Sequence, residues 1–492
     1  MITRRNFLIA GGALVASTAV PRPAAPAEAS RDVDDVHSQL NRTRIHAIVR
    51  PSSVGDVQRV VAAARREHRA ISVAGSRHAM GGQQFGDGCV LLDVRGMRRI
   101  LDLDRRRGVV DVEAGIEWPE LIQGLGRMQD GVTPAWGIVQ KQTGADHFTI
   151  GGALASNVHG RGLRFRPIVQ DVESLTLVDA GGRVVTCSRE TNSELFALVI
   201  GGYGLFGVVT SVRLRLAPRR KLRRLVEVRD VESLPAAFAE RIADGFEYGD
   251  FQFAIDPRSE DFLRTGVFSC YRPVPDVTPI PSAQRELRYE DWTELLYLAH
   301  ADKRRAFELY RDHYLATDGQ VYWSDEHQLG VYVDDYHRDV DRRLGARDRA
   351  TEMITELYVP RLRLPDFLAE MREDFRQHGV EPIYGSIRLI ERDGETVLAW
   401  AREPWACVVL NLHVVHTPAG LAHAKAAFRR LIRMAAARGG SYYLTYHRWA
   451  TREQVEACHP RLPEVLRQKR VYDPEERFQS EWYRHYRAMF AT

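Results

Sequence analysis

The sequence predicts an α+β protein made of two unequal halves. Residues 44–217 alternate short apolar strand patterns with short helical patterns, and residues 218–492 again mix strands with an amphipathic helix. The chain has 492 residues, of which 44% are hydrophobic and 27% charged. These fractions are ordinary for a globular protein, so a disordered, fibrous or disulfide-framework protein is excluded.

The charge balance predicts no nucleic-acid partner and no strong field toward a membrane surface. Lysine and arginine number 69 and aspartate and glutamate 65, which leaves a net charge of +4 over a long chain. The densest basic run is Arg219–Arg224, and we interpret it as a solvated linker face. Five widely spaced cysteines without a C-x-x-C motif predict neither a metal site nor a disulfide framework.

Residues 1–29 have the pattern of an export signal. Arg4 and Arg5 precede an apolar run over 7–20, and an A-x-A cleavage pattern follows at 27–29. The paired arginines resemble the twin-arginine signal, whose route carries proteins already folded, often around a cofactor. An ordinary secretory signal is the alternative. We therefore expect a periplasmic or extracellular protein, and no other segment is apolar and long enough for a membrane span.

Local patterns give the elements of the first half in order. Apolar residues recur at helical spacing over 57–64, and a strand over 70–74 runs into a glycine-rich loop. Residues 110–114 alternate apolar and acidic side chains, as in a half-buried strand. The last elements are a hairpin of strands 172–178 and 183–187, a helix over 192–200 and a strand over 207–216. Pro218 marks the boundary between the halves.

The second half has clear patterns only toward its end. Strands are predicted over 353–359, 383–390 and 406–415. A helical face over 424–435 is stopped by a glycine pair. Residues 228–350 are rich in Asp, Arg and Tyr, and we expect helices and loops there.

Three glycine-rich segments are the candidates for ligand binding, and they span residues 73–82, 149–160 and 201–210. Small residues let backbone N–H groups turn toward one anion and let the backbone approach a flat ligand. Any one of them alone is more typical of a turn. The third contains G-x-G-x-x-G, but a helix precedes it and a strand follows, which is the reverse of a nicotinamide-binding context.

Together these segments resemble the FAD-binding domain of the vanillyl-alcohol oxidase / p-cresol methylhydroxylase (PCMH) family. The opening at 51–57 and the closing signature at 192–196, which leads into the third segment, match as well. The resemblance covers residues 44–217. It implies a PCMH-type domain whose two subdomains clasp FAD, followed by a substrate (cap) domain over 218–492 whose C-terminal segment returns to the flavin.

The resemblance also implies which residues hold the cofactor. The first loop would hold the pyrophosphate, the second segment would pass the ribityl chain and isoalloxazine, and the third would meet the adenine end. The implied FAD-binding residues are Ala74, Gly75, Ser76, Arg77, His78, Ala79, Gly81, Gly82, Thr149, Gly151, Gly152, Ser156, Asn157, His159, Gly207 and Val208.

His78 matches the position where many family members join histidine covalently to the flavin, although some relatives bind it without a bond. Certain relatives add a second tether through a cysteine. His147 occupies that place here, so the resemblance implies a single attachment.

The C-terminal region resembles that of sugar, alditol and aldonolactone oxidases in the same family. The likeness lies in residues 443–448, 472–474 and 478–480. Those relatives usually place a lysine near the flavin, and Tyr446 stands here instead. Ser386-Ile387-Arg388 resembles a Glu-Ile-Arg strand of alditol oxidase, with the arginine kept and the glutamate absent.

The expected chemistry is oxidation of a carbinol, in which a hydride goes to flavin N5 and the hydroxyl proton to a base. His447 is the first candidate base because its ordinary pKa lies near working pH, and Tyr446 is the alternative. Arg388 would hold an oxygen-rich substrate or favour the reduced flavin anion. His413-x-x-His416 has a metal-like spacing, but on a strand the two side chains face opposite sides, so no metal is expected.

The leading hypothesis is thus an exported FAD-dependent oxidoreductase that acts on a polyol, sugar or sugar lactone, with O2 or an electron carrier as acceptor. One alternative is a flavin dehydrogenase of the same fold for a hydroxy acid or lipid-linked alcohol, with a membrane or protein acceptor. A second alternative is a flavin-binding protein without catalysis.

Overall fold

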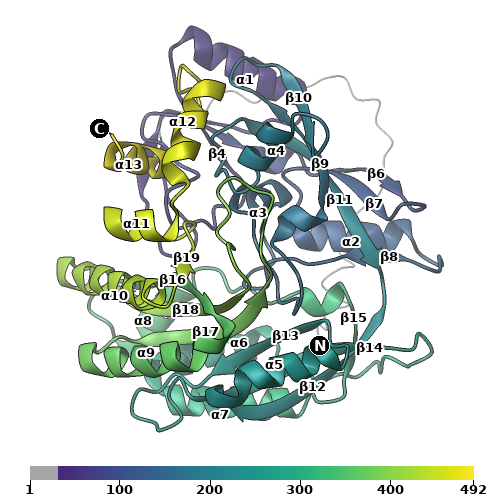
Figure 1. The fold of residues 1–492 in the computed structure, drawn as a ribbon, viewed down its shortest axis with the longest axis vertical. Helices are drawn as coiled ribbons and strands as arrows, with labels where there is room; N and C mark the ends of the chain where they lie inside the picture. The colour runs from purple at the N-terminus through teal and green to yellow at the C-terminus, as the bar shows by residue number, and fades with distance from the viewer. Residues whose placement is uncertain (1–30, 492) are drawn as a thin grey trace.

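The structure is a computed structural model that describes residues 31–491. The predicted signal at 1–29 lies outside these residues. Within them, the search for an apolar helix of membrane-spanning length finds none. Three larger sheets and their helices form two lobes, which Figure 1 shows stacked one above the other.

A small parallel sheet opens the first lobe. Its strands lie in the order β3 (Ala47–Val49), β5 (Val90–Asp93) and β4 (Ile71–Ala74). The predicted helix is α1 (Val54–Arg66), which begins at Ser53 because that side chain accepts the N–H of Asp56. Val57, Val61 and Ala64 of α1 pack on Ile71 and Leu92 of the sheet. An antiparallel pair, β1 (Arg31–Val33) and β2 (Thr43–Ile45), precedes it.

An antiparallel sheet completes the first lobe. Its strands lie in the order β10 (Val184–Ser188), β9 (Val172–Val178), β11 (Val208–Pro218), β7 (Val109–Glu113) and β6 (Ile100–Asp104), and β8 (Trp136–Ile138) pairs with β11. Helices α2 (Trp118–Met128), α3 (Ile150–Ser156) and α4 (Ser193–Val199) belong to this lobe. Because α4 precedes the third glycine segment and β11 follows it, the structure confirms that the Rossmann context is reversed.

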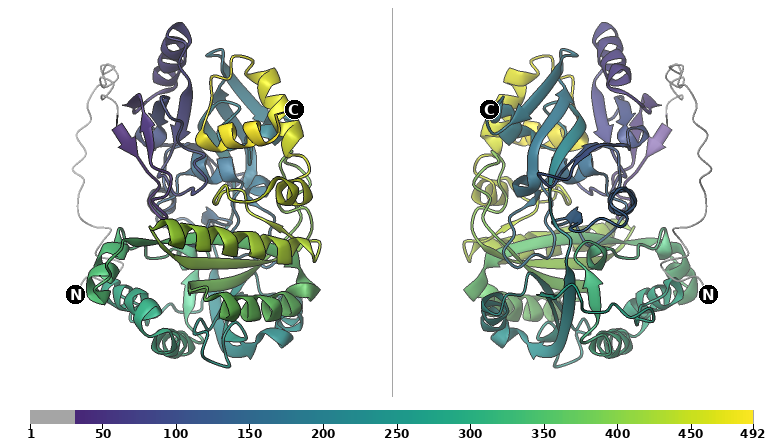
Figure 2. Two further views of the ribbon diagram at one scale, coloured as in Figure 1. Left: turned by 90° about the vertical axis from the view of Figure 1, so that its left-hand side faces the viewer. Right: turned by 90° about the vertical axis from the view of Figure 1, so that its right-hand side faces the viewer.

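An eight-stranded sheet forms the second lobe. Its order is β15 (Val321–Trp323), β12 (Lys221–Asp230), β14 (Thr265–Val274), β13 (Tyr248–Phe253), β17 (Pro382–Ile390), β18 (Trp405–Val415), β16 (Ala350–Pro360) and β19 (Ser441–Tyr442), and every pairing is antiparallel. Helices α9 (Leu364–His378) and α10 (Pro418–Ala436) pack on β16, as Figure 2 shows. The remaining helices of this lobe are α5 (Leu234–Ala243), α6 (Tyr289–Ala301), α7 (Lys303–Leu315) and α8 (Tyr336–Leu344).

The C-terminal segment returns from the second lobe to the first. It contains α11 (Arg452–Cys458), α12 (Leu462–Tyr472) and α13 (Glu481–Met489), the yellow helices in Figure 1. The N–H of Ile71 donates to the carbonyl of Arg477 at 2.7 Å, and Phe478 enters the core beneath α1. The tail therefore joins the sheet that carries the first glycine-rich loop.

Two interpretations of the second half need correction. Residues 228–350 contain the strands β13 and β14 besides helices. β14 is buried over 266–271, so it lacks the alternation that is typical of a half-buried strand. The basic run Arg219–Arg224 is not a solvated face. Arg219 pairs with Asp325 at 2.9 Å, and Arg224 is buried because it lies on the inner side of β12.

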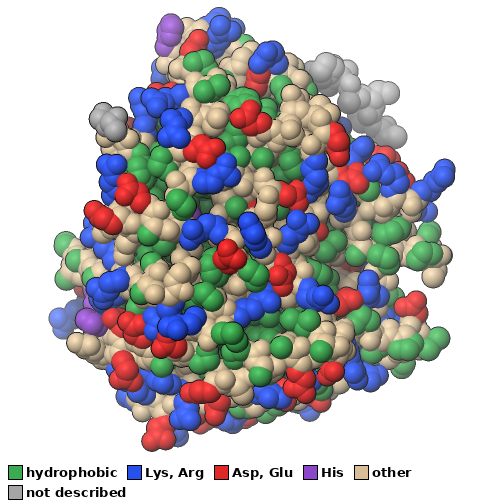
Figure 3. All heavy atoms as spheres, viewed as in Figure 1, with side chains coloured by type: hydrophobic (Ala, Val, Ile, Leu, Met, Phe, Trp, Pro, Cys, Tyr) green, Lys and Arg blue, Asp and Glu red, His purple; other side chains and the backbone are tan. Residues whose placement is uncertain are grey.

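The visible surface carries no large field of one sign. In Figure 3 basic and acidic side chains alternate over both lobes on the face shown. This mixture agrees with the small net charge of +4.

Candidate flavin and substrate site

One cavity of about 440 Å³ lies between the two lobes and collects most of the predicted residues. All three glycine-rich segments line it from one side, and side chains of β13, β16, β17 and β18 line it from the other. The predicted residues in its wall are Gly75, Ser76, Arg77, His78, Ala79, Thr149, Gly151, Gly152, Ser156, Gly207, Arg388 and Tyr446.

Six predicted cofactor residues lie behind this wall and not in it: Ala74, Gly81, Gly82, Asn157, His159 and Val208. Asn157 has a left-handed backbone (φ 49°), and its side-chain nitrogen donates to Asp393 at 2.9 Å. Ala74 and Val208 end and begin strands of the two sheets. These residues shape the segments that line the cavity.

The first and second glycine segments approach each other closely at Gly75. A Cβ on Gly75 would lie 2.1 Å from the Thr149 hydroxyl oxygen, and one on Gly151 would lie 2.9 Å from the Cβ of Ala114. Thr149 is fixed because its side chain accepts the N–H of Gly152 at 3.2 Å to begin α3. The cradle therefore depends on bare backbone on both segments, which suits a flat, phosphate-bearing ligand such as FAD.

The hydrogen bonds of His78 fix its tautomer. Its Nε2 lies 3.0 Å from the carbonyl oxygen of His147, which can only accept, so Nε2 carries the hydrogen. Its Nδ1 lies 2.8 Å from Nε2 of His37, so His37 donates to the Nδ1 lone pair. The Tyr332 hydroxyl donates to the Val36 carbonyl at 3.3 Å and lies 3.4 Å from Nδ1 of His37. The unprotonated nitrogen of His78 is thus Nδ1.

Burial keeps both rings neutral. Desolvation lowers the pKa of His37 to about 4, with Asp35 opposing it. Desolvation, aided by His37, also holds the pKa of His78 well below its ordinary value. A neutral imidazole keeps the lone pair that a nucleophile needs.

Glu117 connects the first glycine segment, beside His78, with the residues just before the second glycine segment. It accepts from the Ser76 hydroxyl at 2.6 Å and lies 2.8 Å from Nδ1 of His147. The hydrogen bond with Glu117 raises the pKa of His147. His147, at the place of the possible second tether, therefore helps to position the first glycine-rich loop through Glu117. Its carbonyl orients His78.

On the substrate side, Tyr446 and Glu356 form a hydrogen-bonded pair. The Tyr446 hydroxyl donates to Glu356 Oε1 at 2.8 Å, and the Tyr358 hydroxyl donates to Oε2 at 2.8 Å. Glu356 lies on β16 and is fully buried, yet it lines the cavity. Because its hydrogen points at Glu356, Tyr446 keeps its oxygen lone pairs for another donor.

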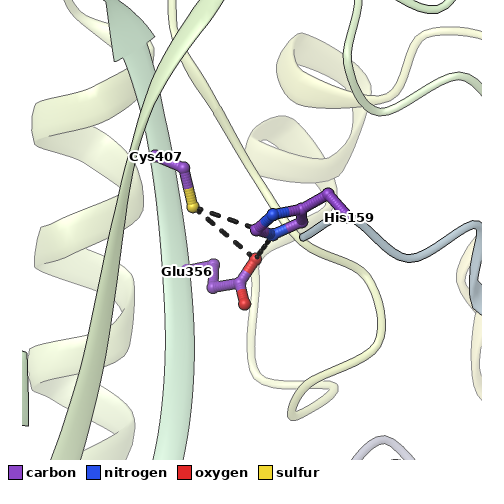
Figure 4. A group of neighbouring side chains, drawn as sticks. All are labelled: His159, Glu356 and Cys407. Atoms are coloured by element: carbon purple, nitrogen blue, oxygen red, sulfur yellow. Dashed lines mark hydrogen bonds and ion pairs between the residues drawn. The ribbon is translucent and has the colours of Figure 1, made fainter. Parts of the chain in front are cut away.

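His159 and Glu356 lie in hydrogen-bond contact (Figure 4). Nδ1 of His159 lies 3.0 Å from the Gly160 carbonyl, so that nitrogen carries a hydrogen. Nε2 lies 3.0 Å from Glu356 Oε2, and two acceptors cannot face each other without a proton between them. Burial alone raises the pKa of Glu356, but His159 outweighs it and lowers that pKa to about 2.

Cys407 adds a third potential metal ligand to this pair. In the part of the chain that the structure describes, His159, Glu356 and Cys407 are the one such group, with ligand atoms within 4.8 Å of one another. The Cys407 sulfur lies 3.8 Å from Glu356 Oε2, and burial raises the pKa of its thiol well above the ordinary value. Since hydrogen bonds already engage His159 and Glu356, we assign the group to a buried proton-sharing network.

Arg388 reaches the same cavity from β17. Its side chain is buried and donates to the Gln142 side-chain oxygen at 3.2 Å. Burial lowers the pKa of Arg388, but Tyr384 and Glu356 more than restore it, so the group stays charged. Ser386, in the place of the missing glutamate, is buried two residues before it.

The structure separates His447 from the other two catalytic candidates. His447 does not line the cavity, and its ring stacks on Trp449 with the ring centres 4.3 Å apart. Burial lowers its pKa to about 4. Consecutive side chains of this irregular segment point to different sides, so Tyr446 reaches the cavity and His447 reaches the core. Likewise, His413 contacts His300 and His416 contacts Thr351, so the two do not converge.

Sequence reasoning missed Glu356 and His37. Glu352 and Glu356 lie within a strand pattern of apolar residues and threonines, and carboxylates in such a strand were the available signal. His37 precedes every motif recognised in the FAD-binding domain, and only the folded chain brings it to His78.

Comparison with known proteins agrees with this geometry. Residues 45–188 match the family described as FAD binding domain, and this part of the chain is a PCMH-type FAD-binding domain in an α+β fold. The L-gulono-1,4-lactone dehydrogenase of Mycobacterium tuberculosis is 31% identical over 240 residues, which is 49% of this chain and 52% of that protein. The L-gulonolactone oxidase of Mus musculus is 31% identical over 170 residues, or 34% and 37% of the two chains.

Cytokinin dehydrogenase 2 of Arabidopsis thaliana is 31% identical over 179 residues, 35% of this chain and 34% of that protein. The matched region therefore spans about half or less of these relatives' own length. Their names point to different substrates.

Proposed function

We propose that the protein is an FAD-dependent oxidoreductase that oxidises the CH–OH group of a sugar lactone, sugar or polyol. The observation that carries the proposal is the cavity itself: a flavin-type cradle on one wall faces Tyr446 and Arg388 on the other. Two of the similar proteins named above are described by their action on gulonolactone.

When bound, FAD would accept the hydride that leaves the carbinol carbon, so that two electrons pass to the flavin and a carbonyl forms. Tyr446 supports this reaction as the proton acceptor. Its oxygen takes the hydroxyl proton of the substrate while its own hydrogen moves toward Glu356, 2.8 Å away. The low pKa of Glu356 makes it a weak base. The transfer of the proton from the substrate through Tyr446 to Glu356 must therefore accompany breakage of the C–H bond. Arg388 orients the substrate oxygens.

FAD is proposed to be joined covalently to Nδ1 of His78. The neutral ring, its fixed tautomer and its place in the cavity wall support the link. A covalent flavin would stay with the protein after export, where no pool of free FAD replaces a lost one.

Export by a twin-arginine route belongs to the same proposal and rests on Arg4 and Arg5. Replacing both with lysine should strand flavin-loaded precursor in the cytoplasm, as cell fractionation would show. Unchanged export would exclude the route.

The activity is tested by anaerobic flavin reduction with a panel of polyols, lactones and hydroxy acids. Bleaching by a carbinol donor is the expected result, and hydrogen peroxide release in air would then identify O2 as the acceptor. If the flavin stays oxidised with every donor, the proposed activity is refuted and the alternative of a flavin-binding protein without catalysis is favoured.

A further inference from the structure

The end of the cavity formed by β12 and β13 has an excess of buried positive charge. Arg224 of β12 and Arg161, which follows the second glycine segment, both line the cavity. Arg224 is only 9% exposed, and the side chain of Arg161 is 14% exposed. Buried guanidinium groups are costly unless an anion neutralises them.

The carboxylates at hand do not balance these cations. Arg161 pairs with Asp250 at 3.4 Å, a long contact. Arg224 donates to the hydroxyls of Tyr271 and Thr317, which are neutral, and forms no ion pair with a carboxylate of residues 31–491. Arg388, which also lines the cavity, likewise has only the neutral Gln142 as a hydrogen-bond partner in that range.

The other acidic groups in the wall are already used. Glu356 lies 3.0 Å from Nε2 of His159, and Glu352 lies 3.0 Å from Nε2 of His300. Burial together with Arg161 and Arg224 holds the pKa of His327 well below its ordinary value, so this neighbour adds no charge. Three arginines therefore share one carboxylate, Asp250, whose one ion pair is the long contact with Arg161.

We propose that this end of the cavity binds an anionic group of the substrate, a carboxylate or a phosphate. The oxidised carbinol would lie between Tyr446 and Arg388, while the anion would lie at Arg161 and Arg224. The preferred substrate is then an acidic sugar derivative, such as a sugar acid or sugar phosphate, and its neutral counterpart is a poorer donor. Arg224 and Arg161 act as specificity residues. This inference rests on the proposed function, because it names the substrate class of the same site.

The aromatic surroundings support this assignment. The Arg224 guanidinium carbon lies 5.1 Å from the Tyr314 ring centre and 4.9 Å from that of Tyr322, and both tyrosines line the cavity. Stacked rings hold a guanidinium in one orientation and shield it from water. A charge-assisted hydrogen bond to an anion is stronger in such a place.

The test compares matched donors in anaerobic reduction of the flavin-loaded protein. The pairs are L-gulonate against L-gulono-1,4-lactone, and D-sorbitol 6-phosphate against D-sorbitol, so that the carboxylate and phosphate sources are separate arms. We expect the anionic member of at least one pair to have a kcat/KM higher by about tenfold or more. Equal or better reduction by the neutral member in both pairs would overturn the proposal.

The variants locate the effect. Arg224→Gln should abolish the preference, Arg224→Lys should keep much of it, and Arg223→Gln is the matched control because Arg223 is exposed on the opposite face of β12. Arg161→Gln is a second variant should Arg224→Gln fail to retain flavin. A preference unchanged in both glutamine variants would refute the assignment.

Binding without turnover separates this inference from the proposed function. Calorimetric titration of the flavin-loaded protein with inorganic phosphate and with acetate should show saturable binding that Arg224→Gln weakens about tenfold or more and Arg223→Gln does not. If no donor reduces the flavin, the proposed function fails while this measurement still decides the anion site. If neither phosphate nor acetate binds saturably, the proposed anion site is overturned.

Discussion

Nε2 of His37 donates a hydrogen bond to Nδ1 of His78 over 2.8 Å. Because Nε2 of His78 is engaged by the His147 carbonyl, this contact leaves Nδ1 as the unprotonated nitrogen. A residue that precedes the FAD-binding domain thus orients the ring proposed to carry the flavin.

This contact predicts the behaviour of two variants. His78→Ala should release all flavin on acid denaturation. His37→Ala should slow covalent attachment about fivefold, because a net hydrogen bond of ~1 kcal/mol no longer holds the ring. The measurement is the time course of flavin retained by acid-precipitated protein after FAD is added to apoprotein. His46→Ala is the control, since His46 is exposed. Complete release of flavin from the unaltered protein would contradict the link.

The Tyr446–Glu356 contact predicts a specific loss of rate. Tyr446→Phe should slow anaerobic flavin reduction by ~10²-fold or more while substrate binding changes less, because proton transfer is removed and the ring is kept. Tyr358→Phe is a sharp comparison, since its hydroxyl also donates to Glu356 but does not line the cavity. A similar loss of reduction rate in both variants would contradict proton transfer by Tyr446. It would indicate that the two hydroxyls only hold Glu356 in place.

The close approach of Gly75 to Thr149 predicts that Gly75→Ala loses FAD. A methyl group there would overlap the Thr149 hydroxyl, so the two glycine segments must move apart. The flavin content of the purified protein measures the effect. Gly126→Ala serves as control because its Cβ would meet no atom within 4 Å. Normal flavin content in Gly75→Ala would show that the cradle is not this tight.

Asp171 predicts a pH-dependent stability. Burial raises the pKa of its carboxyl from 3.8 to about 7, against hydrogen bonds from Gln140 and Gln170. The folded state therefore binds the Asp171 proton more tightly than the unfolded state does. The stability that this proton contributes is lost as pH rises from about 4 to about 7. Relative to the unaltered protein, Asp171→Asn should become more stable as pH rises through this window. The gain above the window should be on the order of 4 kcal/mol at most.

Thermal unfolding of both proteins between pH 5 and 8, an interval about the raised pKa of Asp171, measures this difference. Glu173→Gln provides the control, since Glu173 pairs with Arg107 at the surface. A difference between Asp171→Asn and the unaltered protein that stays constant with pH would contradict the shifted pKa.

Local sequence predicted those parts of the fold that local forces decide. The periodic apolar face over 424–435 became α10, and the glycine segments lie where backbone must approach backbone. Strands β13 and β14 escaped prediction for separate reasons. Polar residues interrupt the pattern of β13, and its partner β17 lies far away in the chain, whereas β14 is buried over most of its length and shows no two-residue alternation.

The candidate site shows the same division. His78, Thr149 and Arg388 belong to motifs and could be recognised by position. Glu356 acquires its role only when sheet pairing and the C-terminal tail bring it to Tyr446. The basic run was misread because whether Arg224 faces solvent or the cavity depends on which side of β12 is covered.

The most direct test of the account is single-turnover reduction of the bound flavin, without oxygen, by a carbinol donor and by the same donor deuterated at the carbinol carbon. The account predicts complete bleaching of the flavin that is several-fold slower with the deuterated donor, because the C–H bond breaks as hydride leaves. Flavin that stays oxidised with every carbinol donor, or bleaching at the same rate with both isotopes, would contradict it.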